Sequence, residues 1–209
     1  MQVDLLEYEK SLYKQGYELI AGTDEAGRGP LCGPVVASAV ILPKNYHLEG
    51  LTDSKQLTEK QREAFYKIIM QDAISVGISV IDNDVIDEIN ILEASRKAMQ
   101  NAIDKLSVKP DYILTDAMDL HTSNCLPIIK GDQKSITIAA ASVIAKVTRD
   151  HIMYDYDLKY PEYEFKNHKG YPTKKHLQNL EKYGVLDFYR KSYAPVKKII
   201  ERGKENEDF

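Results

Sequence analysis

Four acidic residues follow short predicted strands, where their side chains could share one site. Residues 17–23 lead into Asp24 and Glu25, residues 112–115 lead into Asp116, and residues 127–130 lead into Asp132. Because the carboxyl ends of neighbouring strands meet at one edge of a sheet, we expect these carboxylates to converge. Sites built only from oxygen ligands suit hard divalent ions such as Mg²⁺ or Mn²⁺.

The chemistry of such a cluster would be phosphodiester hydrolysis. Two divalent ions about 3.5–4 Å apart activate a water and stabilise the leaving oxygen. The spacing alone also fits solvated turn residues, which acids at strand ends commonly are. Adjacent strand residues point to opposite faces, so Asp24 and Glu25 can serve one site only if the chain leaves strand geometry there. Gly27 makes such a departure available.

The glycine turn at residues 27–33 does not fit a dinucleotide-binding loop. Its spacing, GxGxxxG, is one residue too long, and a strand follows where a pyrophosphate-binding helix would begin. Instead, Gly27 and Gly29 let the backbone approach a ligand closely, and Arg28 supplies a cation suited to phosphate. The alternative is a tight turn that merely requires positive φ.

The composition fits one globular domain, or one domain with an appendage, in a chain of 209 residues. Two cysteines, Cys32 and Cys125, exclude a disulfide-stapled scaffold, and we expect them to be buried thiols. The acidic N-terminus lacks the apolar stretch of a signal peptide, and no apolar run is long enough for a membrane span. We therefore expect a cytoplasmic protein with no membrane contact.

The net charge of −4 conceals an uneven distribution. Residues 166–202 hold ten Lys and Arg against three acids, whereas residues 1–165 hold 17 against 26. A basic segment beside an acidic body fits a polyanion contact next to metal-binding carboxylates. On charge alone, the favoured interpretation is a solvated basic helical face.

The order of elements predicts an α/β protein with a mixed central sheet flanked by helices. Strands are expected at 17–23, 35–42, 74–81, 112–115 and 127–130. Helices are expected at 5–15, 58–71, 83–106 with a break near Asn90, 136–160, 173–183 and 196–201, with a loop over 161–172. We divide the chain into an N-terminal helix (1–16), a main domain (17–160) and a basic helical C-terminal segment packed on it (161–209), with a disordered tail near 203–209.

Several motifs together resemble the ribonuclease HII family, the bacterial-type members of type 2 ribonuclease H. Residues 23–36, TDEAGRGPLCGPVV, look like its signature. The other matching segments are DSKQL (53–57), TDA (115–117), KGD (130–132), AAASVIAKVTRD (139–150), NHKGYPT (167–173) and RKSYAPV (190–196). They occur in the family's order across residues 17–196, which is more specific than any one motif.

The resemblance implies an RNase H-like fold and an endonuclease that uses two divalent ions, Mg²⁺ or Mn²⁺. Its substrates would be RNA/DNA hybrids and duplex DNA with embedded single ribonucleotides. Cleavage on the 5′ side of the ribonucleotide would leave 5′-phosphate and 3′-hydroxyl ends. Such an enzyme removes ribonucleotides from DNA in replication and repair, and we expect it to act as a monomer.

The resemblance also assigns roles to individual residues. The metal ligands would be Asp24, Glu25, Asp116 and Asp132. The strip Gly27-Arg28-Gly29 would sense the 2′-hydroxyl, which distinguishes RNA from DNA. Tyr171 would pack against the sugar next to the ribonucleotide, because a 2′-hydroxyl there would crowd its ring.

Other residues in the motifs have two interpretations each. We expect Lys55, Lys146 and Arg149 to contact phosphates. Lys146 could also be an ordinary exposed helix lysine, and Arg149 could pair with Asp150, which we take as structural. His168 could assist proton transfer or be a loop histidine, and Asn90 could bind near the substrate or break and cap its helix.

Three alternatives compete with this interpretation. Ribonuclease HIII usually carries an extra N-terminal domain and a glycine strip centred on lysine, whereas here 23 residues precede Asp24 and the strip is centred on Arg28. A nuclease of the same fold acting only on DNA would not need the glycine strip or Tyr171. A non-enzymatic nucleic-acid-binding protein would bind its ligand whether or not Asp116 is present.

Overall fold

A five-stranded mixed sheet forms the centre of the structure, as the sequence predicts. The computed structural model describes residues 4–207, with side chains up to Gly203. The strands are β1 (Ile20–Ala26), β2 (Val35–Ile41), β3 (Ser75–Ile81), β4 (Tyr112–Asp116) and β5 (Cys125–Ile128), in the order β3-β2-β1-β4-β5. The pairs β1–β2 and β2–β3 are antiparallel, and β1–β4 and β4–β5 are parallel.

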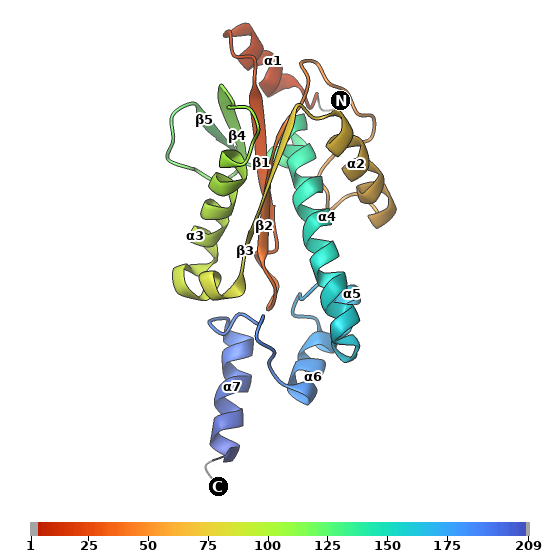
Figure 1. Cartoon of the computed structure of the whole chain (residues 1–209), viewed down its shortest axis with the longest axis vertical. Helices are drawn as coiled ribbons and strands as arrows, with labels where there is room; N and C mark the ends of the chain where they lie inside the picture. The colour runs from red at the N-terminus through yellow and green to blue at the C-terminus, as the bar shows by residue number, and fades with distance from the viewer. Residues whose placement is uncertain (1–3, 208–209) are drawn as a thin grey trace.

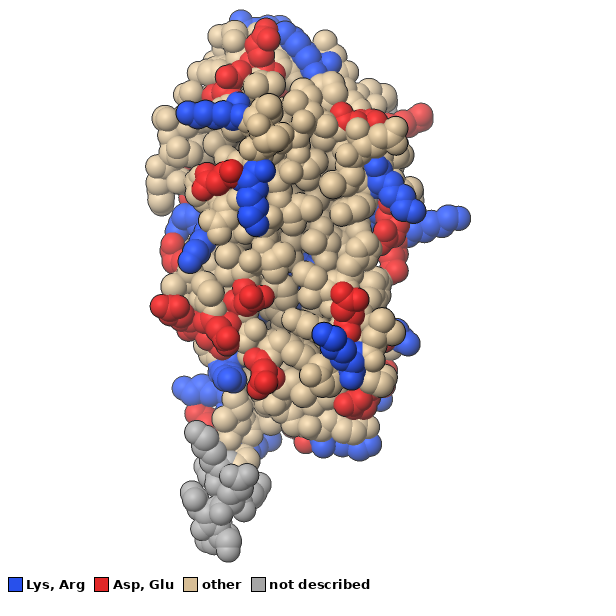
Figure 2. Space-filling view, viewed as in Figure 1, with Lys and Arg blue, Asp and Glu red and all other residues tan. Residues whose placement is uncertain are grey.

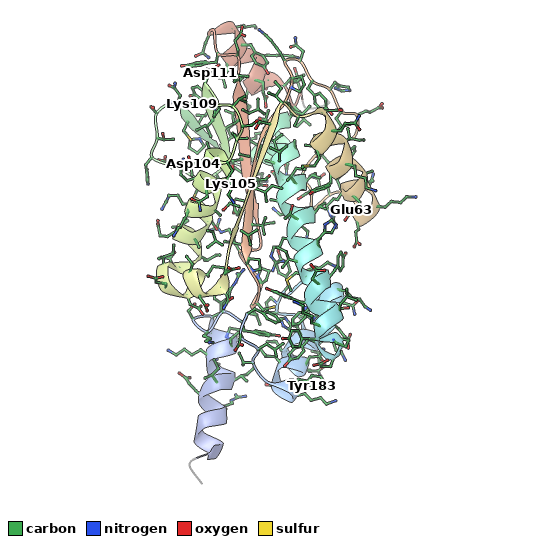
Figure 3. The ribbon with its side chains drawn as sticks, viewed as in Figure 1. Glu63, Asp104, Lys105, Lys109, Asp111 and Tyr183 are labelled. Carbon is green, nitrogen blue, oxygen red and sulfur yellow. The ribbon has the colours of Figure 1, made fainter. Side chains whose placement is uncertain are left out.

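Two long helices cover the two faces of the sheet (Figure 1). On one face α3 (Asn83–Asp104) packs on Ala37 and Ala39 of β2, and on the other α4 (Ile136–Lys159) packs on Val40. The Ser38 hydroxyl donates 2.7 Å to the Ala141 carbonyl of α4. Because successive strand residues face opposite sides, β2 is buried along its whole length, as its apolar run predicts. Side chains fill both spaces between helix and sheet (Figure 3).

The remaining helices lie around this core. They are α1 (Glu7–Lys14), α2 (Glu59–Asp72), α5 (Phe165–His168), α6 (Lys174–Tyr183) and α7 (Ala194–Glu207), with short 3₁₀ turns at Gly131–Gln133 and Pro161–Tyr163. Helix α2 packs on the outer side of α4 and begins with a capping box between Thr58 and Gln61. The C-terminal segment joins α4 through a cluster of aromatic residues that includes Tyr156, Phe165 and Phe188.

One carboxylate ties the start of β1 to the start of β4. Asp111 lies one residue before β4, and its Oδ2 accepts hydrogen bonds from the backbone N–H groups of Glu18 (3.0 Å) and Leu19 (2.8 Å). Asp111 is labelled at this end of the sheet in Figure 3. These bonds help to fix the parallel register of the two strands, and that register decides which residues meet at the opposite end.

The structure differs from the sequence expectations in four places. Strand β1 continues to Ala26 and so contains both Asp24 and Glu25, because β2 pairs with it along its full length. The stretch 161–172, expected to be a loop, forms a 3₁₀ turn and α5. Strand β5 begins at Cys125, two residues earlier than expected. Helix α7 continues to Glu207 where a disordered tail was expected; the rest of that tail, and residues 1–3 of the N-terminal helix, lie outside the described part.

Asn90 breaks and caps α3, one of its two expected roles. Its backbone lies at φ 68° and ψ 166°, and its Oδ1 accepts hydrogen bonds from the N–H groups of Leu92 (2.9 Å) and Glu93 (3.1 Å). This is the pattern of an N-cap that restarts the helix.

Two expectations drawn from composition can also be compared with the structure. Cys32 is buried as expected, whereas Cys125 is only half-buried, and both thiols are free. Within residues 4–207, none of the helices combines the length and the apolar character that crossing a membrane requires.

Gly22 provides a test of the packing between β1 and α4. A Cβ at this position would lie 2.2 Å from the carbonyl carbon of Thr137, a backbone atom that cannot swing aside. We predict that Gly22→Ala lowers the free energy of unfolding by about 3 kcal/mol, measured by urea denaturation. Gly203→Ala is the control, because no heavy atom lies within 4 Å of a Cβ there. Equal unfolding midpoints for the two variants would contradict this account of the packing.

Candidate active site

The parallel register brings Asp24 and Asp116 to the same end of the sheet. Thr23 of β1 pairs with Thr115 of β4, and each aspartate is the next residue on its strand. Residues at matching positions on neighbouring strands project to the same face. Asp24 is 5 % exposed, because α4 covers this face.

Asp132 reaches the same point from the turn between β5 and α4. The turn is linked to β4 because the N–H group of Gly131 donates 2.7 Å to Asp116 Oδ1. Asp24, Asp116 and Asp132 each offer a carboxylate oxygen, and these oxygens lie within 4.8 Å of one another. The structure therefore gathers three of the four carboxylates expected from the sequence.

Glu25 lies beside this cluster and not within it. Its neighbour Asp24 takes the cluster face, as expected for adjacent residues of a regular strand. Glu25 Oε1 lies 3.4 Å from the Arg28 guanidinium, while Glu25 Oε2 is buried and has no hydrogen-bond partner among residues 4–207. A buried carboxylate oxygen without a partner is costly, so this atom is suited to a cation.

Crowding and burial make the ionised carboxylates unfavourable. Burial raises the pKa of Asp24 well above its usual value, and the charges of Glu25 and Asp116 raise it further. Burial also raises the pKa of Asp132 to about 6, with the charges of Asp116 and Asp53 adding to the effect. Divalent cations would offset this repulsion, so the donor set and its electrostatics both fit a metal site.

Lys55 provides a positive charge close to the cluster. Burial lowers the pKa of its ammonium group, but the charges of Asp24, Asp53 and Asp132 more than compensate, and its pKa is raised. Its backbone N–H group donates 2.8 Å to Asp53 Oδ1, which fixes the segment that carries it. The expected phosphate contact at Lys55 is compatible with this position.

Arg149 is buried and uses most of its donors to hold the backbone. Its guanidinium is 1 % exposed and donates to three backbone carbonyls, those of Cys32 (3.2 Å), Pro34 (3.1 Å) and Lys169 (3.0 Å). These bonds give the guanidinium a structural task, but Arg149 also lines the cavity of the candidate site, and the expected phosphate contact stays a prediction. The alternative pairing with Asp150 is not formed within residues 4–207.

A second buried arginine, Arg190, holds the glycine turn from the other side. It donates to the carbonyls of Gly27 (2.6 Å), Arg28 (3.0 Å) and Gly33 (2.9 Å). Sequence reasoning missed this role, because nothing in the pattern RKSYAPV indicates that the arginine is fully buried. Together the two arginines fix the backbone of residues 27–34. Gly27 is required there, since a Cβ would lie 2.2 Å from Arg149 Nε.

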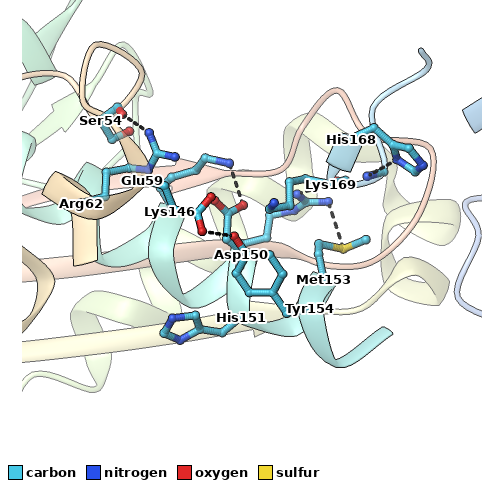
Figure 4. A network of polar contacts seen from close by, with 12 residues as sticks. Ser54, Glu59, Arg62, Lys146, Asp150, His151, Met153, Tyr154, His168 and Lys169 are labelled. Atoms are coloured by element: carbon cyan, nitrogen blue, oxygen red, sulfur yellow. Dashed lines mark hydrogen bonds and ion pairs between the residues drawn. The ribbon is translucent and has the colours of Figure 1, made fainter. Parts of the chain in front are cut away.

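Lys146 is neither free nor an ordinary exposed lysine. Its side chain is 21 % exposed, and Nζ donates 2.7 Å to Asp150 Oδ1, one helical turn along α4 (Figure 4). Burial lowers the pKa of Lys146, and the charge of Asp150 opposes that change. The pairing gives Asp150 a structural role, and a phosphate contact at Lys146 would have to share its ammonium group with Asp150.

Glu9 is a further residue that sequence reasoning missed. It is fully buried, and its Oε1 accepts hydrogen bonds from Ser135 Oγ (2.6 Å) and from the N–H (3.2 Å) and hydroxyl (2.9 Å) groups of Thr137. Glu9 thereby anchors α1 to the first turn of α4, directly after the turn that carries Asp132. An acid on the buried face of a short helix was the available signal.

Most of the predicted site residues line one cavity of ≈ 150 Å³. Its lining includes Asp24, Glu25, Gly27, Arg28, Gly29, Lys55, Lys146, Arg149 and Tyr171. Tyr171 is 44 % exposed, and its ring lies so close to Gly29 that a Cβ there would be 3.2 Å from Cε1. A larger cavity of ≈ 770 Å³ lies between residues 4–6 and the 47–56 loop, but no carboxylate cluster lines it. The chemistry therefore places the site at the smaller cavity.

Charged groups elsewhere are interleaved. On the face shown in Figure 2, Lys and Arg side chains alternate with Asp and Glu side chains and form no continuous basic surface. The uneven charge along the sequence therefore does not produce a large basic patch on this face.

Comparisons with known proteins agree with the geometry. The ribonuclease HII family profile matches residues 21–196. The chain belongs to this family. A ribonuclease HII from Acholeplasma laidlawii is 55% identical over 202 residues, which cover 97% of this chain and 100% of that protein. The crystal structure of ribonuclease H2 from Pyrococcus horikoshii OT3 superposes with a TM-score of 0.79 at 29% identity, covering 90% of this chain and 100% of that one.

A more distant structure shares only the fold. The crystal structure of Bst-RNase HIII in complex with Mn²⁺ superposes with a TM-score of 0.69 at 16% identity, covering 92% of this chain and 72% of that one. Membership of the ribonuclease HII family makes the chain a metal-dependent ribonuclease H that acts on RNA/DNA substrates. It decides against ribonuclease HIII, a DNA-only nuclease and a non-enzymatic binding protein.

The raised pKa of Asp132 predicts how stability depends on pH. Since folding raises the pKa from 3.8 to about 6, the metal-free protein loses stability as the pH rises through this interval. We predict that Asp132→Asn raises the free energy of unfolding in chelator at pH 7.5 by about 1–3 kcal/mol. The gain should vanish near pH 4.

Thermal or urea unfolding at the two pH values measures this difference. Asp155→Asn, at an exposed acid of α4 that makes no side-chain hydrogen bond or ion pair within the described residues, serves as the control and should change the free energy of unfolding by less than about 0.5 kcal/mol. If Asp132→Asn instead lowered the free energy of unfolding at pH 7.5, the ionised carboxylate would be stabilised by its neighbours and not repelled by them.

Proposed function

We propose that this ribonuclease H cuts the RNA strand of RNA/DNA hybrids and nicks duplex DNA on the 5′ side of single embedded ribonucleotides. The products would carry 5′-phosphate and 3′-hydroxyl ends, and the role would be ribonucleotide removal from DNA. One observation carries the proposal: Asp24, Glu25, the glycine strip and Tyr171 line a single cavity, and a carboxylate oxygen of Asp24 lies within 4.8 Å of those of Asp116 and Asp132.

We infer that Asp24, Asp116 and Asp132, with Glu25 beside them, hold two divalent ions. The supporting observations are the oxygens within 4.8 Å, the raised pKa values and the buried Glu25 Oε2 that lacks a partner. Mg²⁺ and Mn²⁺ both suit oxygen ligands, and Mn²⁺ is the ion bound in the Bst-RNase HIII structure. Two such ions would supply activation of a water and stabilisation of the leaving 3′-oxygen.

The strip Gly27-Arg28-Gly29 would recognise the 2′-hydroxyl through its backbone. Arg190 occupies the carbonyls of Gly27 and Arg28, which holds the peptide planes in place. The N–H groups of Arg28 and Gly29 have no hydrogen-bond partner within residues 4–207, and they remain able to donate. Rigid donors next to the acids can select the one sugar that carries an acceptor at this position.

Tyr171 would test the neighbouring sugar. Its ring packs against Gly29 and is partly exposed to the cavity. A flat aromatic face accommodates a deoxyribose and is crowded by a 2′-hydroxyl. The ring would therefore favour an RNA–DNA junction, with Lys55 as a phosphate contact and Lys146 as a second one shared with Asp150. The monomeric state and cytoplasmic location expected from the sequence stay predictions.

Asp116→Asn tests the role of the acids. We predict that this change lowers the rate of cleavage by about 100-fold or more, because the site loses a charged ligand. The fold should remain intact, as judged by circular dichroism and the unfolding midpoint. Asp119→Asn, in the loop that follows β4, is the matched control and should retain full activity. Full activity of Asp116→Asn would overturn the carboxylate assignment.

Tyr171→Ala tests the recognition of the junction. We predict a loss of about tenfold in nicking at a single ribonucleotide, since one stacking contact of this kind contributes about 1–3 kcal/mol. Cleavage inside a long hybrid should fall much less, and Tyr171→Phe should resemble the unmodified protein. An equal loss on both substrates would count against the junction role.

A further inference from the structure

Two buried histidines lie stacked beneath the loop that carries Tyr171. The rings of His168 in α5 and His176 in α6 have centroids 4.1 Å apart and an interplanar angle of 12°. His168 is 7 % exposed and His176 is fully buried. Neither ring lines the cavity of the candidate active site, so direct contact with substrate does not explain them.

The hydrogen bonds of His168 determine which of its nitrogens carries the proton. Nε2 lies 2.9 Å from the Tyr163 carbonyl, which can only accept, so Nε2 donates. Nδ1 lies 3.1 Å from the backbone nitrogen of Gly170, whose N–H group can only donate, so Nδ1 accepts. His168 is therefore neutral, and one of its two bonds goes directly to the residue before Tyr171.

His176 binds the carbonyl of Tyr171 itself, in the same loop. Its Nδ1 donates 2.9 Å to the Tyr171 carbonyl, and its Nε2 accepts 2.7 Å from the Tyr189 hydroxyl. Burial lowers the pKa of His176 to about 4, so it too is neutral near pH 7. The two rings thus hold groups of two consecutive residues, the N–H of Gly170 and the C=O of Tyr171.

The other side of this loop is attached to the glycine turn. The N–H group of Leu31 donates 2.8 Å to the Gly170 carbonyl, and Arg149 donates 3.0 Å to the Lys169 carbonyl. With the histidine bonds, the loop backbone is fixed from both sides. The Tyr171 ring, exposed and without a side-chain hydrogen bond among residues 4–207, depends on that backbone for its position over Gly29.

We propose that His168 and His176 are positioning residues that hold the Tyr171 ring against Gly29 and so set the discrimination between junction and continuous hybrid substrates. The effect on substrate discrimination rests on the proposed function of Tyr171, whereas the positioning of the ring does not. Loss of either histidine's hydrogen bond to the loop would leave residue 171 a tyrosine but would allow its ring to move away from Gly29.

A fluorescent reporter tests the positioning without reference to activity. The chain contains no tryptophan, so Tyr171→Trp introduces a single indole at the site. In that background we expect His168→Ala to lower the fluorescence anisotropy of the indole and to increase its quenching by acrylamide. His168→Asn should restore both values, because its amide oxygen can accept from the Gly170 N–H group.

Substrate discrimination supplies the second readout. We expect His168→Ala to lower the ratio of single-ribonucleotide nicking to hybrid cleavage by about three- to tenfold, the effect of one lost buried hydrogen bond. On a Tyr171→Ala background the same change should not alter the ratio further, because the histidine acts through the ring. His168→Leu fills the same volume and replaces the alanine variant if that variant does not fold.

Tyr163→Phe is the matched control. It lies in the same aromatic cluster, and its hydroxyl donates to the Gly184 carbonyl, away from the loop. It should lower the unfolding midpoint without changing anisotropy or the substrate ratio. Unchanged anisotropy and ratio in a folded His168→Ala or His168→Leu would overturn the proposal. If His168→Ala changes the anisotropy but Tyr171→Ala leaves the substrate ratio unaltered, the positioning role stands and the junction role of Tyr171 is rejected.

Discussion

The repulsion among three crowded carboxylates, two of them buried, is the constraint on which the rest of this structure depends. Asp24, Asp116 and Asp132 place oxygens within 4.8 Å of one another, and in a buried setting their charges oppose the fold. The sheet has to hold them together, and it does so through the β1–β4 register and the Gly131 N–H bond to Asp116. The free energy stored in this arrangement is what makes the cluster ready to bind cations.

Recognition beside the cluster depends on an equally rigid backbone. Two buried arginines, Arg149 and Arg190, donate to carbonyls of the glycine turn and so fix its geometry. The loop of Tyr171 is joined to the same turn through Leu31. The acidic cluster, the strip Gly27-Arg28-Gly29 and the Tyr171 ring are therefore parts of one connected framework, in which a small shift at one part moves the others.

The sequence predicts most of this framework where local pattern decides the outcome. Apolar runs predicted the strands, and the predicted end of the strand at 112–115 placed Asp116 at the edge of the sheet. The pattern could not show that β1 continues through Glu25, because that depends on pairing with β2. Nor could it show that Arg149 turns inward or that Glu9 anchors α4, because burial of a charge is decided by contacts between distant segments. For the same reason the predicted four-acid cluster has Glu25 beside it and not within it.

The most direct test is cleavage by the purified protein of three labelled duplexes: DNA with one ribonucleotide, DNA alone and a long RNA/DNA hybrid. Each would be incubated with Mg²⁺, with Mn²⁺ or with a chelator. The account predicts metal-dependent nicking 5′ to the single ribonucleotide, cleavage of the hybrid and an intact DNA duplex. Cleavage of the DNA duplex, or of the long hybrid alone, would contradict the central claim that one rigid site combines metal binding with recognition of a single 2′-hydroxyl.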